Sequence, residues 1–227
     1  LVQEFAGNDT MDFHLILNPV FQSEFQFLEH LCKLFGVALP FRSSMDYLEA
    51  LQNHLFQKAA QEGRTVVLIV DEGQNLTPSL IEALRTLLNY ETNEYKLLQL
   101  VLLGQVELYS KIVNMPNFMD RISFKYTLNP LDVKETKELI NFRVKAAGYN
   151  SRMDIFLDEA VSEIYNYTRG YPRKITKLCH QVLKELILQN KHAVDRLLVR
   201  DVIANEEQYK LGAIDFPSSI NPNNPAP

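Results

Sequence analysis

The sequence predicts an α/β protein, in which a three-layer parallel sheet is followed by a small bundle of helices. The first observation is the unbroken aliphatic run Val66–Val70, rich in β-branched residues, which is typical of a strand buried on both faces. The second is the alternation of strand and helix patterns along the first half of the chain, which is typical of parallel sheets. The third is that strand patterns stop at Asn129-Pro130 and only helical patterns follow.

The strands expected besides Val66–Val70 cover Phe13–Leu17, Leu97–Leu103 and a brief stretch, Ser123–Leu128. Apolar residues at helical spacing predict the helices between and after them. Ser44 and Thr77 are expected to be N-caps, since their hydroxyls can accept the free N–H groups of a first turn. The expected helices run over residues 23–35, 44–61, 78–88 and 106–112, and those of the bundle over 133–147, 157–168, 172–189 and 199–207.

Pro130 is the expected hinge between two domains. We expect an α/β core over residues 1–129 and a helical lid over 130–212. Residues 213–227 are polar and rich in proline, which predicts a linker or a disordered tail.

Composition excludes several classes of protein. A net charge of -5 argues against a chain built throughout for nucleic acid. The histidines have no metal-ligand spacing, so we expect no structural metal. Cys32 and Cys179 lie in apolar helical patterns and are expected to be reduced, with a disulfide as the less favoured alternative. No stretch reaches the roughly 18 apolar residues of a membrane helix, and no secretory signal is visible.

Two carboxylates, Asp71 and Glu72, directly follow the strand Val66–Val70. Ligands of parallel sheets bind beyond the carboxyl ends of the strands. Many nucleotide hydrolases hold Mg²⁺ there with one acid and polarise a water with another. The alternative is that Asp71 only caps the helix that follows, and the acidic pair alone does not decide between the two.

Four stretches of the sequence carry a resemblance to a known family: VVLIVDEGQNL (66–76), LQLVLLGQVEL (98–108), DRISFKYTLNPL (120–131) and RGYPRKITKLCHQVL (169–183). In this order they resemble the AAA+ ATPases, and more narrowly the general secretion pathway protein A type. Relatives of that type include pilus-assembly and transposition target-selection ATPases. The resemblance extends from about Phe13 to Glu207 and implies a P-loop NTPase core with a helical lid.

The resemblance implies roles for residues at the strand ends. Asp71 matches the Walker B aspartate that holds Mg²⁺ on ATP, and Glu72 matches the residue that orients and deprotonates the attacking water. Gln105 matches the sensor of the terminal phosphate, although a strand-end cap is its alternative. Asn18 matches the polar switch residue that holds the glutamate away, although Asn before Pro is also ordinary turn chemistry.

Two arginines also match functional positions. Arg121 corresponds to the arginine finger, which reaches the γ-phosphate held by a neighbouring subunit. Its alternative is an exposed arginine paired with Asp120. Arg173 corresponds to the second sensor at the start of a helix, where an anion is favoured. Its alternative is a solvated basic patch with Lys174 and Lys177.

One departure from the family matters most, since the sequence contains no G-x-x-x-x-G-K-[ST] phosphate loop. Family members carry that loop just before a helix whose end resembles Leu1–Phe5. We therefore expect that this chain begins after its Walker A motif. Such a piece should bind ATP weakly or not at all.

The resemblance implies an ATPase that forms a ring, hexameric by analogy, and drives or regulates the assembly of an envelope secretion or pilus machine. Such a protein would be cytoplasmic, or held at the inner face of the bacterial inner membrane by regions outside this chain. One alternative is a transposition-type regulator that binds DNA in an ATP-dependent way. Another is a non-catalytic scaffold with the AAA+ fold.

Overall fold

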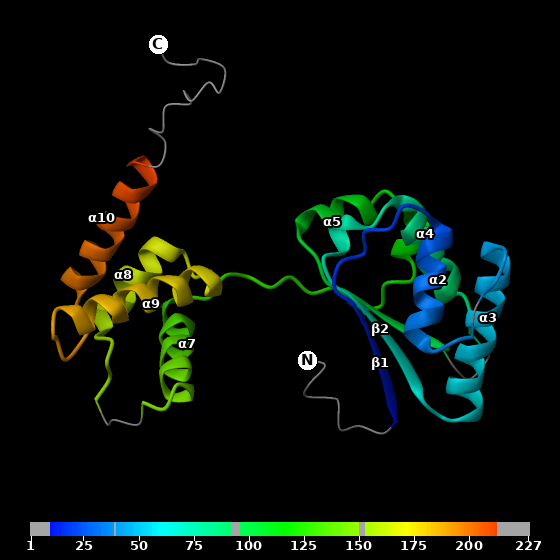
Figure 1. Ribbon diagram of the computed structural model, residues 1–227, viewed down its shortest axis with the longest axis horizontal. Coiled ribbons are helices and arrows are strands. Elements are labelled where there is room, and N and C mark those ends of the chain that lie inside the picture. The colour runs from blue at the N-terminus through cyan, green and yellow to red at the C-terminus, as the bar shows by residue number, and fades with distance from the viewer. Residues whose placement is uncertain (1–9, 39, 92–95, 150–152, 213–227) are drawn as a thin grey trace, which may run out of the picture. The chain divides into compact units, whose positions relative to one another are not determined.

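A computed structural model describes residues 10–38, 40–91, 96–149 and 153–212 of the chain (Figure 1). They divide into two units, residues 1–125 and residues 126–227, and each unit is described by itself. The expected helix end at Leu1–Phe5 and the expected tail over 213–227 lie outside the described residues.

The first unit is built on three parallel strands in the order β1-β2-β3. These are β1 (Met11–Ile16), β2 (Thr65–Val70) and β3 (Leu98–Leu102), and they confirm three of the predicted strands within two residues at each end. Ile16 pairs with Val70, and Val70 pairs with Leu102. The carboxyl ends of all three strands therefore lie at one edge of the sheet, which we call the carboxyl rim.

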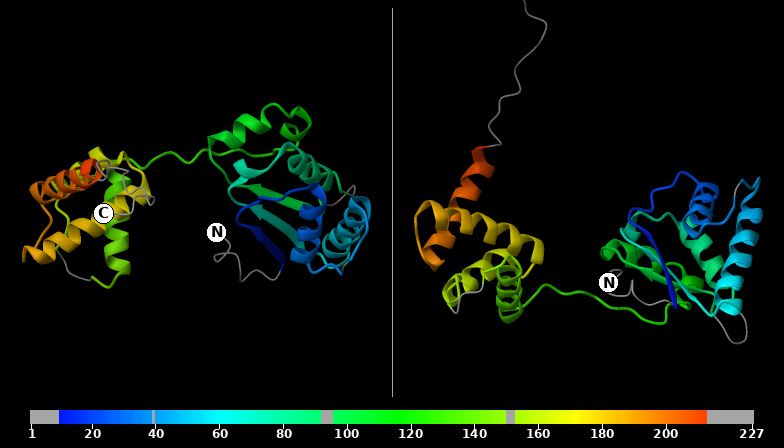
Figure 2. Two further views of the ribbon diagram at one scale, coloured as in Figure 1. Left: turned by 45° about the horizontal axis from the view of Figure 1, so that its top comes forward. Right: turned by 60° about the horizontal axis from the view of Figure 1, so that its bottom comes forward.

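Helices α2 (Glu24–Phe35), α3 (Ser44–Phe56) and α4 (Pro78–Leu88) lie on one side of the strands (Figure 2). Val66, Leu68 and Val70 of β2 belong to the same apolar core as the buried stripes of these helices. Side chains alternate along a strand, so Val67 and Ile69 point to the opposite face, and both are also buried. The prediction that β2 is buried on both faces is confirmed.

The start of α3 differs from the prediction by one residue. Its N-cap is Ser43, not Ser44, because the Ser43 hydroxyl accepts the N–H of Asp46 while the Asp46 carboxylate accepts the N–H of Ser43. This reciprocal capping box satisfies two backbone donors. The helix ends at Phe56, and the predicted extension to Gln61 is a π-helical turn, η1 (Gln57–Gln61).

The predicted strand over Ser123–Leu128 is wrong. Residues 122–132 are irregular, and the sheet that the structure describes contains β1, β2 and β3 only. The alternating side chains Phe124, Tyr126 and Leu128 fit strand periodicity, and all three are exposed. Periodicity reports the conformation of one segment, whereas a strand also requires a neighbour that shares its backbone hydrogen bonds.

The second unit contains the four predicted helices, now α7 (Val133–Ala146), α8 (Asp158–Thr168), α9 (Pro172–Leu188) and α10 (Arg196–Gly212). Their buried side chains form one apolar cluster that includes Ile164, Ile175 and Leu198. Helix α10 begins three residues before its predicted start, because the Asp195 carboxylate accepts the N–H of Leu198 at 2.8 Å.

Both cysteines are free thiols, as predicted. Burial raises the pKa of Cys32 to about 11 and the pKa of Cys179 to about 12. Since the thiolate is the reactive form, neither side chain suits nucleophilic chemistry near neutral pH.

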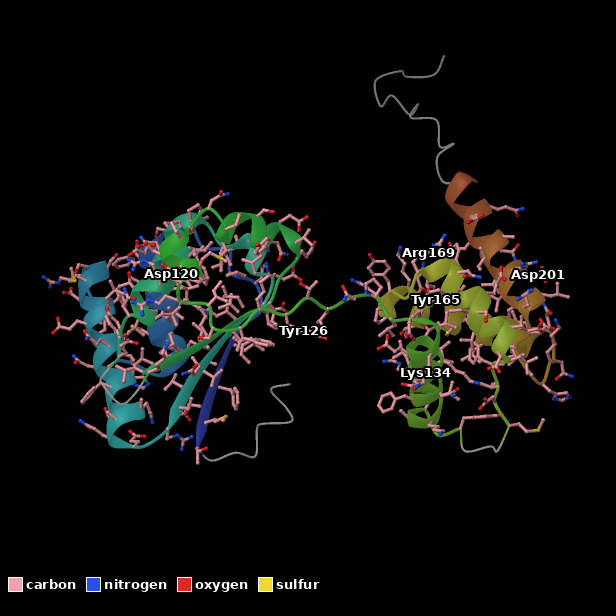
Figure 3. The ribbon with its side chains drawn as sticks, turned by 180° about the vertical axis from the view of Figure 1, so that it is seen from behind. Asp120, Tyr126, Lys134, Tyr165, Arg169 and Asp201 are labelled. Atoms are coloured by element: carbon pink, nitrogen blue, oxygen red, sulfur yellow. The ribbon has the colours of Figure 1, made fainter. Side chains whose placement is uncertain are left out.

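A close backbone contact joins the segment before α7 to the end of α8. Arg169, labelled in Figure 3, and Gly170 both have positive φ angles, of 54° and 75°. The N–H of Leu131 donates to the Gly170 carbonyl at 2.9 Å. A Cβ atom on Gly170 would lie 1.9 Å from the carbonyl oxygen of Leu131. Only glycine therefore fits at position 170.

We expect Gly170→Ala to lower the free energy of unfolding of the second unit by about 3 kcal/mol, because it adds left-handed strain and breaks the Leu131 contact. Gly148→Ala is the matched control, since Gly148 has a φ of 94° and open space around it. It should cost about 1 kcal/mol through strain alone. Chemical denaturation followed by NMR signals of α8 and α9 measures both, and equal losses would contradict the account.

Candidate functional site at the carboxyl rim

The residues that follow β2 still form backbone hydrogen bonds with the ends of both neighbouring strands. The N–H of Asp71 donates to the Ile16 carbonyl at 2.8 Å, and the N–H of Gly73 donates to the Leu103 carbonyl at 2.8 Å. Glu72, between them, has φ 51° and ψ 37°. A left-handed backbone is uncommon for a residue with a side chain, and such strain clusters at functional sites.

The two acids offer free oxygens at the rim. Asp71 is half-buried, and its Oδ1 accepts the N–H of Glu72 at 2.8 Å, whereas its Oδ2 accepts no hydrogen bond from any described residue. Glu72 is exposed. Carboxylate oxygens are the ligands that Mg²⁺ prefers, so the donor set at this rim fits a magnesium ion.

The 3₁₀ turn η2 (Gly73–Asn75) connects the rim to both outer strands through side-chain amides. On the β1 side, Nδ2 of Asn75 donates to Oδ1 of Asn18 at 3.0 Å. On the β3 side, Oε1 of Gln74 accepts the N–H of Gln105 at 3.1 Å. Nε2 of Gln74 also donates to Oε2 of Glu72 at 2.5 Å. Four predicted site residues, Asn18, Asp71, Glu72 and Gln105, therefore lie together.

Lys111 holds the same turn from helix α5 (Val106–Ile112). Its Nζ donates to the carbonyl of Gln74 at 2.5 Å and to the carbonyl of Leu76 at 3.1 Å. Sequence reasoning missed Gln74, Asn75 and Lys111. The signal available was the pair of amide residues Gln74-Asn75, separated from Glu72 by Gly73 alone, where they can reach both neighbouring strand ends.

The polar contacts at the rim bear on two predicted roles. Asn18 follows the end of β1, and its side chain accepts a hydrogen bond from Asn75. The amide that donates to the Glu72 carboxylate belongs to Gln74. Gln105 is exposed and stands at the N-cap position of α5 without a side-chain capping bond. The switch role of Asn18 and the sensor role of Gln105 stay predictions.

Arg121 follows helix α6 (Pro116–Met119), and the structure does not bring it to the acids of its own chain. Its Nη1 lies 3.7 Å from Oε1 of Glu91, so its partner is Glu91 and not Asp120. Glu91 comes after α4 and before β3, which is at the amino ends of the strands. Asp71 and Glu72 are at the opposite edge of the sheet.

Arg173 lies in the second unit, in the first turn of α9, and its side chain is exposed. The next residues along the helix show why, since Ile175 and Leu178 form the buried stripe and Arg173 is outside it. Lys174 lies over the Tyr171 ring, with Nζ 5.1 Å from the ring centroid. The second-sensor role of Arg173 stays a prediction.

Comparisons with known proteins agree with this architecture. Residues 1–112 match the family model described as "AAA domain". The chain is 33% identical over 183 residues to general secretion pathway protein A of Aeromonas hydrophila, a match that covers 79% of this chain and 32% of that protein. It is 26% identical over 117 residues to a potential ATP-binding protein of Staphylococcus aureus, covering 51% of this chain and 41% of that protein. The chain thus spans less than half the length of either relative.

Solved structures show the same fold. The ORC2 protein of Aeropyrum pernix, in ADPNP-ADP complexes, superimposes with a TM-score of 0.61 at 16% identity, covering 89% of this chain and 54% of that one. Drosophila ORC bound to DNA gives a TM-score of 0.63 at 18% identity, covering 94% and 52%. The RuvB branch migration motor of Thermotoga maritima gives a TM-score of 0.55 at 17% identity, covering 85% of this chain and 52% of that one.

Among the described residues, no helix combines the length and the apolar character that a membrane span requires.

Proposed function

From the AAA+ fold of this chain, its AAA domain match and its similarity to general secretion pathway protein A, we propose that the full-length protein binds and hydrolyses ATP. The observation that carries the proposal is the pair Asp71 and Glu72 at the carboxyl rim, beside the ends of β1 and β3. Nucleotide sites of open α/β sheets lie at this edge.

Each residue at the rim has a proposed task. Asp71 would hold Mg²⁺, whose charge offsets that of the phosphate oxygens. Glu72 accepts a proton from the attacking water, which it can reach because it is exposed at the rim. The side-chain amide of Gln105 donates to the terminal phosphate without adding charge. Asn18 acts on Glu72 through the amides of the η2 turn.

The two arginines come from other elements than the strand ends: Arg121 follows α6 and Arg173 belongs to α9 of the second unit. We assign to Arg121 the stabilisation of γ-phosphate charge in a neighbouring subunit, because it lies beside Glu91, at the other edge of its own sheet from Asp71 and Glu72. This assignment requires a ring, proposed to be a hexamer. Arg173 contributes a permanent positive charge from the first turn of α9, where an anion is favoured.

The similarity to general secretion pathway protein A supports a cellular role in driving or regulating assembly of a secretion or pilus machine from the cytoplasmic side. Turnover of ATP by the full-length protein in the presence of Mg²⁺ is the test of the proposed activity. A wild-type protein that folds, contains the phosphate loop and hydrolyses no ATP would contradict it, and would favour a non-catalytic scaffold.

A further inference from the structure

We propose that Gln74 is a positioning residue that orients the Glu72 carboxylate and couples it to the end of β3. This inference rests on the proposed ATPase function and gives a task of its own to Gln74, one of the two η2 amides through which Asn18 acts. Gln74 is half-buried in the η2 turn, between the strand end that presents Glu72 and the strand end that presents Gln105.

A glutamine can hold both neighbours because its amide carries a donor and an acceptor. Nε2 donates to Oε2 of Glu72 at 2.5 Å, while Oε1 accepts the backbone N–H of Gln105 at 3.1 Å. Oε1 of Glu72 accepts no hydrogen bond from a described residue and is left for the water. A base oriented by a third polar group is the usual arrangement for activating a nucleophile.

The amide has little freedom to move independently of its surroundings. Its backbone carbonyl accepts a hydrogen bond from Lys111, which fixes the turn that carries it. On the β3 side, a Cβ atom on Gly104 would lie 3.0 Å from Oε1 of Gln74. A shift of the Gly104–Gln105 backbone, such as contact with a phosphate would cause, therefore displaces the Gln74 amide and with it the Glu72 carboxylate.

The test compares steady-state kinetics of Gln74→Met with those of the wild-type full-length protein. Methionine is of similar length but lacks the donor and the acceptor, so we expect kcat to fall about 10- to 100-fold while KM for ATP is unchanged. Gln74→Glu keeps an acceptor for the Gln105 N–H but replaces the donor to Glu72 with a second carboxylate, which repels Glu72, and it should lose at least a similar factor. Gln52→Met, on the exposed side of α3, is the matched control and should behave as the wild type does.

A double-mutant cycle separates positioning from general destabilisation. If Gln74 acts through Glu72, then Gln74→Met in a Glu72→Gln background lowers the single-turnover rate no further. The inference is wrong if the rate losses of the two single substitutions multiply in the double variant. It is also wrong if Gln74→Met raises KM for ATP and leaves kcat unchanged. The same holds if Gln74→Met hydrolyses ATP at the wild-type rate. The failure of the proposed function itself looks different, since then the wild-type protein is inactive or Glu72→Gln retains full turnover.

A second readout needs no activity. In the ¹⁵N spectrum of this chain, the Gln105 amide should shift in Gln74→Met, because it loses its acceptor, and should stay near its wild-type position in Gln74→Glu. An unchanged Gln105 signal in Gln74→Met would contradict the coupling to β3.

Discussion

Replacement of Glu72 by glutamine is expected to lower ATP turnover by the full-length protein about 10²- to 10⁴-fold, which is the range for loss of a general base. The amide is nearly the same size as the carboxylate but cannot accept the proton of the attacking water. Glu72 is exposed, so the substitution should leave folding intact. ATP binding should be spared, because Asp71 and the other contacts to the nucleotide are unchanged. Phosphate release and equilibrium ATP binding measure the two effects.

Glu49→Gln is the matched control for this substitution. Glu49 is exposed on α3, and its replacement makes the same change in charge and size. It should leave turnover at the wild-type level. Undiminished hydrolysis by Glu72→Gln would dismiss Glu72 as the base, and loss of ATP binding in that variant would assign it to binding instead.

Replacement of Arg121 by alanine is expected to lower turnover about 10³-fold or more, as loss of an arginine finger does. The positive charge would be missing from the site of the neighbouring subunit and not from the subunit that carries the substitution. Each subunit keeps its own Asp71 and Glu72. ATP binding by Arg121→Ala should therefore remain while hydrolysis stops. Arg42→Ala, which removes an exposed arginine near the start of α3, is the control and should hydrolyse ATP normally.

Mixing the two inactive variants tests whether Arg121 acts between subunits. In a ring assembled from equal amounts of Arg121→Ala and Glu72→Gln, an intact Glu72 meets an intact neighbouring Arg121 at about a quarter of the interfaces. Turnover should recover to about that fraction of the wild-type rate. A mixture as inactive as its components would show that Arg121 and Glu72 must belong to the same chain, contrary to the account.

Sequence reasoning located the rim because its signals are local and repeated. The unbroken run Val66–Val70 indicates a strand buried on both faces, and the alternation with helices indicates parallel neighbours. Parallel strands end at one edge, so Asn18, Asp71 and Gln105 had to come together once the three strands were recognised. The register Ile16–Val70–Leu102 shows that they do.

The contacts of Gln74 and Lys111 could not be predicted in the same way. They depend on the 3₁₀ turn over Gly73–Asn75, on the left-handed backbone of Glu72 and on side-chain rotamers, none of which a periodic pattern specifies. The segment Ser123–Leu128 shows the opposite error, because its pattern fits a strand that the described sheet does not pair.

The measurement that tests the central claim most directly is an equilibrium titration of the full-length protein with ATP, with and without Mg²⁺, for the wild type and Asp71→Asn. The asparagine keeps the shape of Asp71 but removes the charge that would attract the metal. We predict that Mg²⁺ tightens ATP binding by the wild type and has little effect on Asp71→Asn. Binding that responds to Mg²⁺ equally in both proteins would place the metal, and the nucleotide with it, away from the carboxyl rim.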